Sequence, residues 1–127
     1  MVQDKSKVVI CDDDDGILSM LEMIVESTGA SVETESNSAK LLPRLENSQP
    51  ALLIIDLWMP NMPGDAIVRR LREQEKYNDV YILCISASVN GQQVAMEAGA
   101  DKFIAKPFDI YDVLSVVQDV VKLDGVA

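Results

Sequence analysis

The sequence predicts an α/β domain in which five parallel strands form one sheet with helices on both faces. Five short apolar runs alternate with five segments of helical periodicity along the 127 residues, an alternation typical of a parallel sheet covered by helices. No apolar run reaches the roughly 18 residues of a membrane span. Because no repeat or low-complexity linker interrupts the alternation, we expect residues 1–127 to form one domain, with a core from about residue 6 to 122.

The first half of the chain contains two strand–helix pairs. The apolar run 8–11 is followed by a helix whose apolar residues recur with helical spacing until a glycine ends it. That apolar face contains Ile17, Leu18, Met20, Leu21, Ile24, Val25 and Thr28. Residues 30–35 alternate as the second strand. One of the polar residues 36–38 caps a weaker helix through Asn47, which we expect Pro43 to break or bend.

The third strand is the apolar run 52–55, which ends on Asp56. A turn with two prolines follows, and Gly64 opens a helix that buries Ile67, Val68 and Leu71. A strand of this kind is buried on both faces, so Asp56 marks the point where it leaves the sheet.

The last two strand–helix pairs follow the same pattern. The run 80–85 is the fourth strand, and a short helix near 92–98 ends at Gly99. Residues 101–105 contain the fifth strand, and the final helix begins near Asp109. The apolar face of that helix contains Ile110, Val113, Leu114, Val116, Val117, Val120 and Val121. Residues 123–127 carry no clear signal.

Composition narrows the possible functions. The net charge of −10 argues against direct binding of nucleic-acid phosphate and favours a divalent cation or a basic protein surface. The chain has no histidine, which excludes histidine ligands and a phosphohistidine of its own. Residues 1–5 lack the apolar core of a signal peptide, and Cys11 and Cys84 lie in strand-like runs as buried, reduced thiols. We therefore expect a cytoplasmic protein without membrane insertion.

Polar side chains end four of the five predicted strands. Asp12 and Asp13 follow the first strand, Asp56 the third, Ser86 the fourth and Lys106 the fifth. Because these ends lie at one edge of a parallel sheet, the side chains can converge on one crevice. Three carboxylates together require a cation, and oxygen ligands suit Mg²⁺. A cation, an ammonium group and a hydroxyl around a carboxylate form a site for a phosphoryl group on that carboxylate.

Each of these residues also has an ordinary explanation. An aspartate run is common at a helix N-terminus, Asp56 could cap a turn, Ser86 could be a turn hydroxyl, and Lys106 could be a surface lysine. Four separate strand ends that each supply a group for phosphoryl chemistry are harder to explain in this way.

Four segments resemble the receiver domains of two-component response regulators. They are Val8–Asp13, Ile55–Pro60, Ile85–Ala87 and Gly99–Phe108. Each is modest alone, but their order and spacing over nearly the whole chain are specific. The resemblance implies a flavodoxin-like (βα)5 fold, a doubly wound parallel sheet with strand order 2-1-3-4-5.

The resemblance also implies the roles of the site residues. Asp56 would be the phosphoacceptor, Ser86 and Lys106 would contact the phosphoryl oxygens, and Phe103 would move inward together with Ser86 as a switch. The implied Mg²⁺ ligands are Asp12, Asp13, Asp56 and the backbone carbonyl of Trp58. The indole of Trp58 either covers the mouth of the crevice or is an ordinary, partly exposed loop aromatic.

Partners follow from the same resemblance. A sensor histidine kinase or a histidine phosphotransfer protein would supply the phosphoryl group, and a downstream protein would read the phosphorylated state without direct nucleic-acid contact. The chain would catalyse only its own phosphorylation and dephosphorylation, so we do not expect an enzyme. Because it ends soon after the fifth helix, we expect a single-domain regulator or a domain cut from a longer chain.

Two features depart from the family pattern. Serine at position 86 replaces the commoner threonine but keeps the hydroxyl. The segment from Ser86 to Lys106 is about two residues shorter than the pattern, which trims the fourth helix or the loop before it. Because that surface commonly meets partners, partner choice is the property most affected.

Two alternatives belong to other classes. Residues 13–18 resemble the first motif of haloacid-dehalogenase-type phosphatases, with Asp13 as nucleophile and Asp15 as acid/base. That family usually has threonine where Ile17 stands, and this chain has little room for a cap domain. A phosphate-independent interaction module is the third possibility, against which the intact set of site residues argues.

Overall fold

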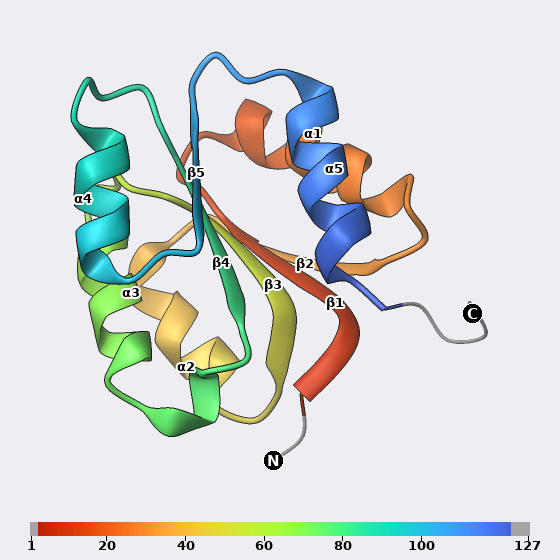
Figure 1. Ribbon diagram of the computed structural model, residues 1–127, viewed down its shortest axis with the longest axis horizontal. Helices are drawn as coiled ribbons and strands as arrows, with labels where there is room; N and C mark the ends of the chain where they lie inside the picture. Colours follow the sequence, from red (N-terminus) through yellow and green to blue (C-terminus); the bar gives the residue numbers. More distant parts are fainter. Residues whose placement is uncertain (1–2, 123–127) are drawn as a thin grey trace.

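The computed structural model describes residues 3–122, and these form a five-stranded sheet between two layers of helices (Figure 1). The strand order is β2-β1-β3-β4-β5, and every neighbouring pair is parallel. The predicted fold class and strand order are confirmed. Residues 1–2 and 123–127 of the predicted domain lie outside the described residues.

Strands and helices alternate along the chain, with two short 3₁₀ helices between them. The elements are β1 Gln3–Cys11, α1 Asp15–Glu26, β2 Ser31–Glu35, η1 Ser38–Lys40, α2 Leu41–Leu45, β3 Gln49–Asp56, α3 Gly64–Arg72, η2 Glu75–Tyr77, β4 Tyr81–Ser86, α4 Gly91–Ala98, β5 Lys102–Ala105 and α5 Ile110–Val120. None of the helices among residues 3–122 has the length and apolar character needed to cross a membrane.

Two apolar cores hold the layers together. Helices α1 and α5 lie on one face of the sheet, and α2, α3 and α4 lie on the other (Figure 1). Alternate residues of the central strands supply the two cores, as the period of a strand requires: Leu52 and Ile54 of β3 pack toward α1 and α5, whereas Leu53 and Ile55 pack toward α3. All eight residues of β3 are buried, which fixes the position of the aspartate at its end.

The central strands begin earlier than their apolar runs. In the register of β1 and β3, Gln3 pairs with Gln49 and Asp4 with Pro50, and an irregularity separates these pairs from the apolar part of the ladder. The side chain of Gln3 donates hydrogen bonds to the carbonyls of Pro50 and Asp79. These extensions depend on pairing between distant segments, so hydrophobic periodicity did not predict them.

The predicted helix from residues 36–38 to Asn47, broken or bent at Pro43, is wrong in its end and in the place of the break, which precedes Leu41. Asn37 does cap the segment, because its Oδ1 accepts from the amide of Ala39. However, the segment divides into η1 and α2, and α2 ends at Leu45. Pro43 lies in the first turn of α2; since it has no N–H to donate to the carbonyl four residues earlier, an α-helix that begins only at Leu41 suits it.

Two side chains predicted to face the core are exposed. Met20 of α1 has 37% of its surface exposed, and Ile110 at the start of α5 has 50%. Met20 lies at one margin of the apolar stripe of α1, whereas Ile110 is the first residue of α5, at the end of its stripe. Neighbouring residues of the same stripes, such as Leu21 and Val113, are buried as predicted.

Candidate functional site

The polar residues predicted at the strand ends meet at one edge of the sheet. Asp12 directly follows β1, Asp56 is the last residue of β3, Ser86 is the last residue of β4, and Lys106 directly follows β5. The amide of Lys106 donates to the carbonyl of Ser86 at 2.9 Å, which joins the last two of these positions. Parallel pairing brings the four strand ends together, as the sequence predicted.

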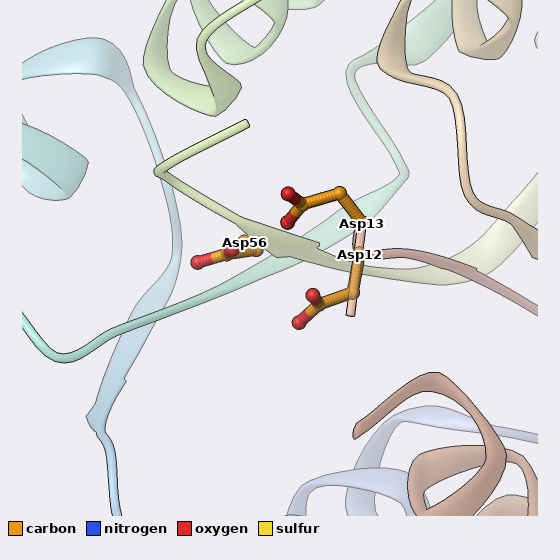
Figure 2. A group of neighbouring side chains, drawn as sticks. All are labelled: Asp12, Asp13 and Asp56. Atoms are coloured by element: carbon orange, nitrogen blue, oxygen red, sulfur yellow. The ribbon is translucent and has the colours of Figure 1, made fainter. Parts of the chain in front are cut away.

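Three carboxylates converge at this edge. Asp12, Asp13 and Asp56 each offer an oxygen, and the three oxygens lie within 4.8 Å of one another. Figure 2 shows the three side chains pointing to the same side of the strand ends. Asp12 and Asp56 are almost fully buried, with 1% and 6% of their surfaces exposed, whereas Asp13 is open to solvent. The cluster therefore combines two desolvated carboxylates with one accessible carboxylate.

Lys106 supplies positive charge to the cluster. Its Nζ lies 3.2 Å from Asp12 Oδ2 and 3.6 Å from Asp56 Oδ1. Asp12 Oδ1 accepts a hydrogen bond from the amide of Asp14 at 2.9 Å, so both oxygens of Asp12 have a donor. One ammonium group between two buried carboxylates leaves net negative charge in the site.

The pKa of Asp56 is shifted by its burial and by the charges around it. Burial raises the pKa of the Asp56 carboxyl, and the charge of Asp12 raises it further; Lys106 and the amide of Trp58 oppose the rise without cancelling it. A bound cation would offset the remaining charge.

The donor set fits Mg²⁺. Carboxylate oxygens are hard ligands, and Mg²⁺ typically takes one or two of them and keeps several waters; the open position of Asp13 leaves room for waters. The nearby thiol does not compete as a ligand, because burial, together with the charges of Glu35 and Asp12, raises the pKa of Cys11 to about 12. Cys11 and Cys84 are free and buried, as predicted.

The turn after Asp56 folds back tightly on the strand end. The amide of Gly64 donates to the carbonyl of Leu57 at 3.0 Å, and the amide of Trp58 reaches Asp56 Oδ1 at 3.4 Å. A Cβ atom on Gly64 would overlap the backbone carbonyl of Asp56. The absence of a side chain at Gly64 therefore lets α3 start directly beside the acidic cluster.

Ser86 and Phe103 meet at the first residue of α4. Ser86 is fully buried, and its Oγ accepts from the amide of Ser88 at 3.0 Å. A Cβ atom on Gly91 would lie 2.7 Å from Cζ of Phe103 and 3.2 Å from Cβ of Ser86. Both side chains thus border the space that the missing side chain leaves open. Sequence reasoning did not single out Gly91, whose signal was only that of a glycine opening a helix.

The indole of Trp58 is largely exposed. Of its surface, 64% is open to solvent, and the residue lines a cavity of about 180 Å³ together with Ser88, Gly91 and Val94. The exposure matches an ordinary loop aromatic on the side of α4. Whether the indole also slows the access of water to Asp56 remains a prediction.

Comparison with known proteins identifies the family. The pattern of the response regulator receiver domain matches residues 8–118, which include every site residue described above. This chain belongs to that family. Receiver domains are signalling modules that take phosphoryl groups from histidine kinases, act on downstream targets and bind Mg²⁺ at an acidic pocket. The predicted family and function class are confirmed, and neither the phosphatase nor the phosphate-independent alternative is favoured.

The receiver resembles both curated and structurally determined proteins. It is 29% identical over 119 residues to the transcriptional regulatory protein PrrA of Mycobacterium leprae, covering 94% of this chain and 51% of PrrA. It is 26% identical to the alkaline phosphatase synthesis transcriptional regulatory protein PhoP of Bacillus subtilis, covering 95% and 50%. The structure of chemotaxis response regulator CheY4 of Vibrio cholerae superimposes with a TM-score of 0.82 at 27% identity, covering 91% of this chain and 98% of CheY4.

The receiver spans about half the length of these curated relatives. Their names describe transcriptional regulation, which belongs to the whole of each protein. The prediction that this chain avoids direct contact with nucleic acid therefore stays a prediction.

Proposed function

We propose that this receiver accepts a phosphoryl group on Asp56 from the phosphohistidine of a sensor histidine kinase or histidine phosphotransfer protein, with Mg²⁺ held by Asp12, Asp13, Asp56 and the Trp58 carbonyl. The observation that carries the proposal is the buried Asp56 carboxylate, 3.6 Å from the Lys106 ammonium and grouped with two further carboxylates. The reaction is self-phosphorylation rather than turnover of a separate substrate.

The chemistry follows from the positions of the side chains. An oxygen of Asp56 attacks phosphorus while the bond from phosphorus to the donor's imidazole nitrogen breaks, so the phosphoryl group moves without an external oxidant or reductant. When bound, Mg²⁺ would neutralise charge on the phosphoryl oxygens. Lys106, now shared by Asp12 and Asp56, then pairs with one phosphoryl oxygen. The Ser86 hydroxyl turns to donate to another.

Ser86 and Phe103 form the proposed switch. If the Ser86 hydroxyl moves toward a phosphoryl oxygen, it changes the space beside Gly91 against which the Phe103 ring lies. The altered surface would be that of α4, β5 and α5, where Met96, Ile110 and Tyr111 expose 46%, 50% and 74% of their surfaces. We propose that a downstream protein reads this surface.

The phosphoryl site itself can be mapped directly. With acetyl phosphate and Mg²⁺, we expect one phosphoryl group per chain, located on Asp56 by reduction of the aspartyl phosphate and peptide mass spectrometry. Labelling should be lost with excess chelator, because the charge of the cluster is then unbalanced. A phosphoryl group on Asp13, or steady hydrolysis of phosphoesters, would contradict the proposal and support the phosphatase alternative.

Gly91→Ala tests the switch. The added Cβ overlaps the far edge of the Phe103 ring, which can rotate away, so we expect a retained fold with a loss of roughly 1–2 kcal/mol. Aromatic NMR signals of Phe103 should respond to beryllofluoride, a phosphoryl mimic, in the parent but not in Gly91→Ala. The chain has two phenylalanines, Phe103 and Phe108, so the phenylalanine signals that remain in Phe108→Leu belong to Phe103. An equal response in both proteins would place the switch elsewhere.

A further inference from the structure

We propose that Asn37, the N-cap of η1, and Ser38, the first residue of η1, are positioning residues that hold the loop after Asp56 in the conformation required for Mg²⁺ binding. We call this pair the Asn37–Ser38 clamp. The inference rests on the proposed function, because it assigns the Trp58 carbonyl to the metal. It adds residues from the segment just after β2, which contributes no group to the acidic cluster.

Two hydrogen bonds form the clamp. Ser38 Oγ accepts from the amide of Met62 at 2.8 Å, and Asn37 Oδ1 accepts from Nδ2 of Asn61 at 2.8 Å. Ser38 is buried, with 2% of its surface exposed, so its loss would leave the part-buried Met62 amide without this partner. Both bonds connect segments 24 residues apart in the chain.

The clamp is itself anchored to the acidic cluster. The amide of Asn37 donates to Glu35 Oε2 at 3.0 Å, and the guanidinium of Arg44 holds the other carboxylate oxygen of Glu35 at 3.0 Å. The backbone carbonyl of Glu35 accepts from the amide of Asp12 at 3.2 Å. The end of β2 and the residues that follow it therefore contact the backbone on both sides of the site: Asp12 after β1 and Met62 after β3.

The loop is held at its ends, where the amide of Leu57 donates to the carbonyl of Ile85 at 3.1 Å and the amide of Gly64 donates to the carbonyl of Leu57 at 3.0 Å, and by the buried side chains of Leu57 and Met59. The backbone at Trp58 itself is less restrained. Between Asp56 and α3, the Trp58 amide makes only the long 3.4 Å bond to Asp56, and Pro63 caps α3 without a side-chain hydrogen bond. A carbonyl ligand on such a loop binds a cation well only if its direction is set beforehand, because ordering the loop would otherwise weaken binding. The clamp supplies this order.

Mg²⁺ affinity tests the clamp separately from phosphorylation. We expect Ser38→Ala to weaken Mg²⁺ binding about fivefold, equivalent to about 1 kcal/mol, as measured by calorimetry. We expect the same loss for Asn61→Ala, which changes an exposed side chain. Asn61→Gln keeps the amide donor and should restore most of the affinity. We also expect Mg²⁺ to change the fluorescence of Trp58 in a saturable way, and this response should shift to higher Mg²⁺ concentration in both alanine variants. Hydrogen exchange at the Met62 amide should accelerate in Ser38→Ala.

Ser27→Ala is the matched control. The Ser27 hydroxyl likewise makes one side-chain-to-backbone hydrogen bond, in which it donates to the carbonyl of Ile24 at 2.6 Å, but it lies at the end of α1, remote from the loop. It should leave Mg²⁺ affinity unchanged. If the parent binds Mg²⁺ and both alanine variants bind it equally well, the clamp is overturned while the proposed function stands. If the parent binds no Mg²⁺, the metal site fails and the clamp fails with it.

Discussion

Asp56→Asn is expected to abolish phosphorylation by acetyl phosphate and Mg²⁺ while the fold is retained. The amide nitrogen and oxygen that replace the carboxylate are poor nucleophiles. Asp12, the other carboxylate beside Lys106, already has a hydrogen-bond donor on each of its two oxygens, Lys106 and the amide of Asp14. Incorporation measured by intact-mass spectrometry should fall by at least about 100-fold. Asp15→Asn is the matched control, because Asp15 is exposed in the same acidic run but lies outside the group of three carboxylates.

Labelling that persists in Asp56→Asn would disprove the assignment. Loss of labelling in Asp15→Asn would instead point to the phosphatase arrangement, in which Asp15 is the acid/base. Circular dichroism should show the same secondary structure for both variants and the parent, since the side chains differ by only a few atoms.

In a buffer that contains a chelator, the difference in stability between Asp56→Asn and the parent is expected to depend on pH. Burial and the charge of Asp12 raise the pKa of Asp56 in the folded protein, so the folded state binds this proton more tightly than the unfolded state. The stability contributed by Asp56 is thus complete below its unfolded pKa and is lost as pH rises through the folded pKa. Asp56→Asn should therefore be more stable than the parent at pH 7, by a margin that shrinks toward about pH 4. Urea denaturation at several pH values measures the margin, and Mg²⁺ should reduce it by stabilising the parent.

Gly64→Ala is expected to impair both stability and phosphorylation. Its Cβ would overlap the backbone carbonyl of Asp56 and approach Leu57 Cα to 2.9 Å, and backbone atoms cannot rotate away as a side chain can. We expect a loss of roughly 1–3 kcal/mol in the free energy of unfolding. Because relief requires the end of β3 to move, the rate of Asp56 labelling should fall by roughly 10- to 100-fold.

Gly16→Ala is the control for this substitution. A Cβ atom on Gly16 would meet only Asp14 Oδ1, at 3.2 Å, and the residue lies in the first turn of α1. There alanine should be neutral or stabilising by up to about 1 kcal/mol. Unfolding midpoints and labelling rates of the two variants separate the effect of the close approach at Gly64 from a general effect of replacing glycine. If Gly16→Ala and Gly64→Ala have the same unfolding midpoint and labelling rate, the close approach of Gly64 to Asp56 does not have the predicted effect.

The sequence alone determined the layers of this protein and the residues at its strand ends. Apolar runs such as 52–55 and helical stripes such as that of α5 are local patterns with a fixed period, and parallel pairing places all strand ends at one edge. Asp12, Asp13, Asp56, Ser86 and Lys106 could therefore be grouped before any distance was known. The structure brings the three carboxylates and Lys106 into contact distance and places Ser86 at the neighbouring strand end.

Tertiary structure decided the contacts that no period encodes. The bond from the Met62 amide to Ser38, the ring of Phe103 against Gly91 and the pairing of Gln3 with Gln49 each join segments well separated in the chain. The exposure of Ile110 likewise depends on how far the sheet extends beneath α5, not on the stripe itself. Hydrogen bonds and close approaches of this kind depend on three-dimensional position, which is fixed only when the layers have packed.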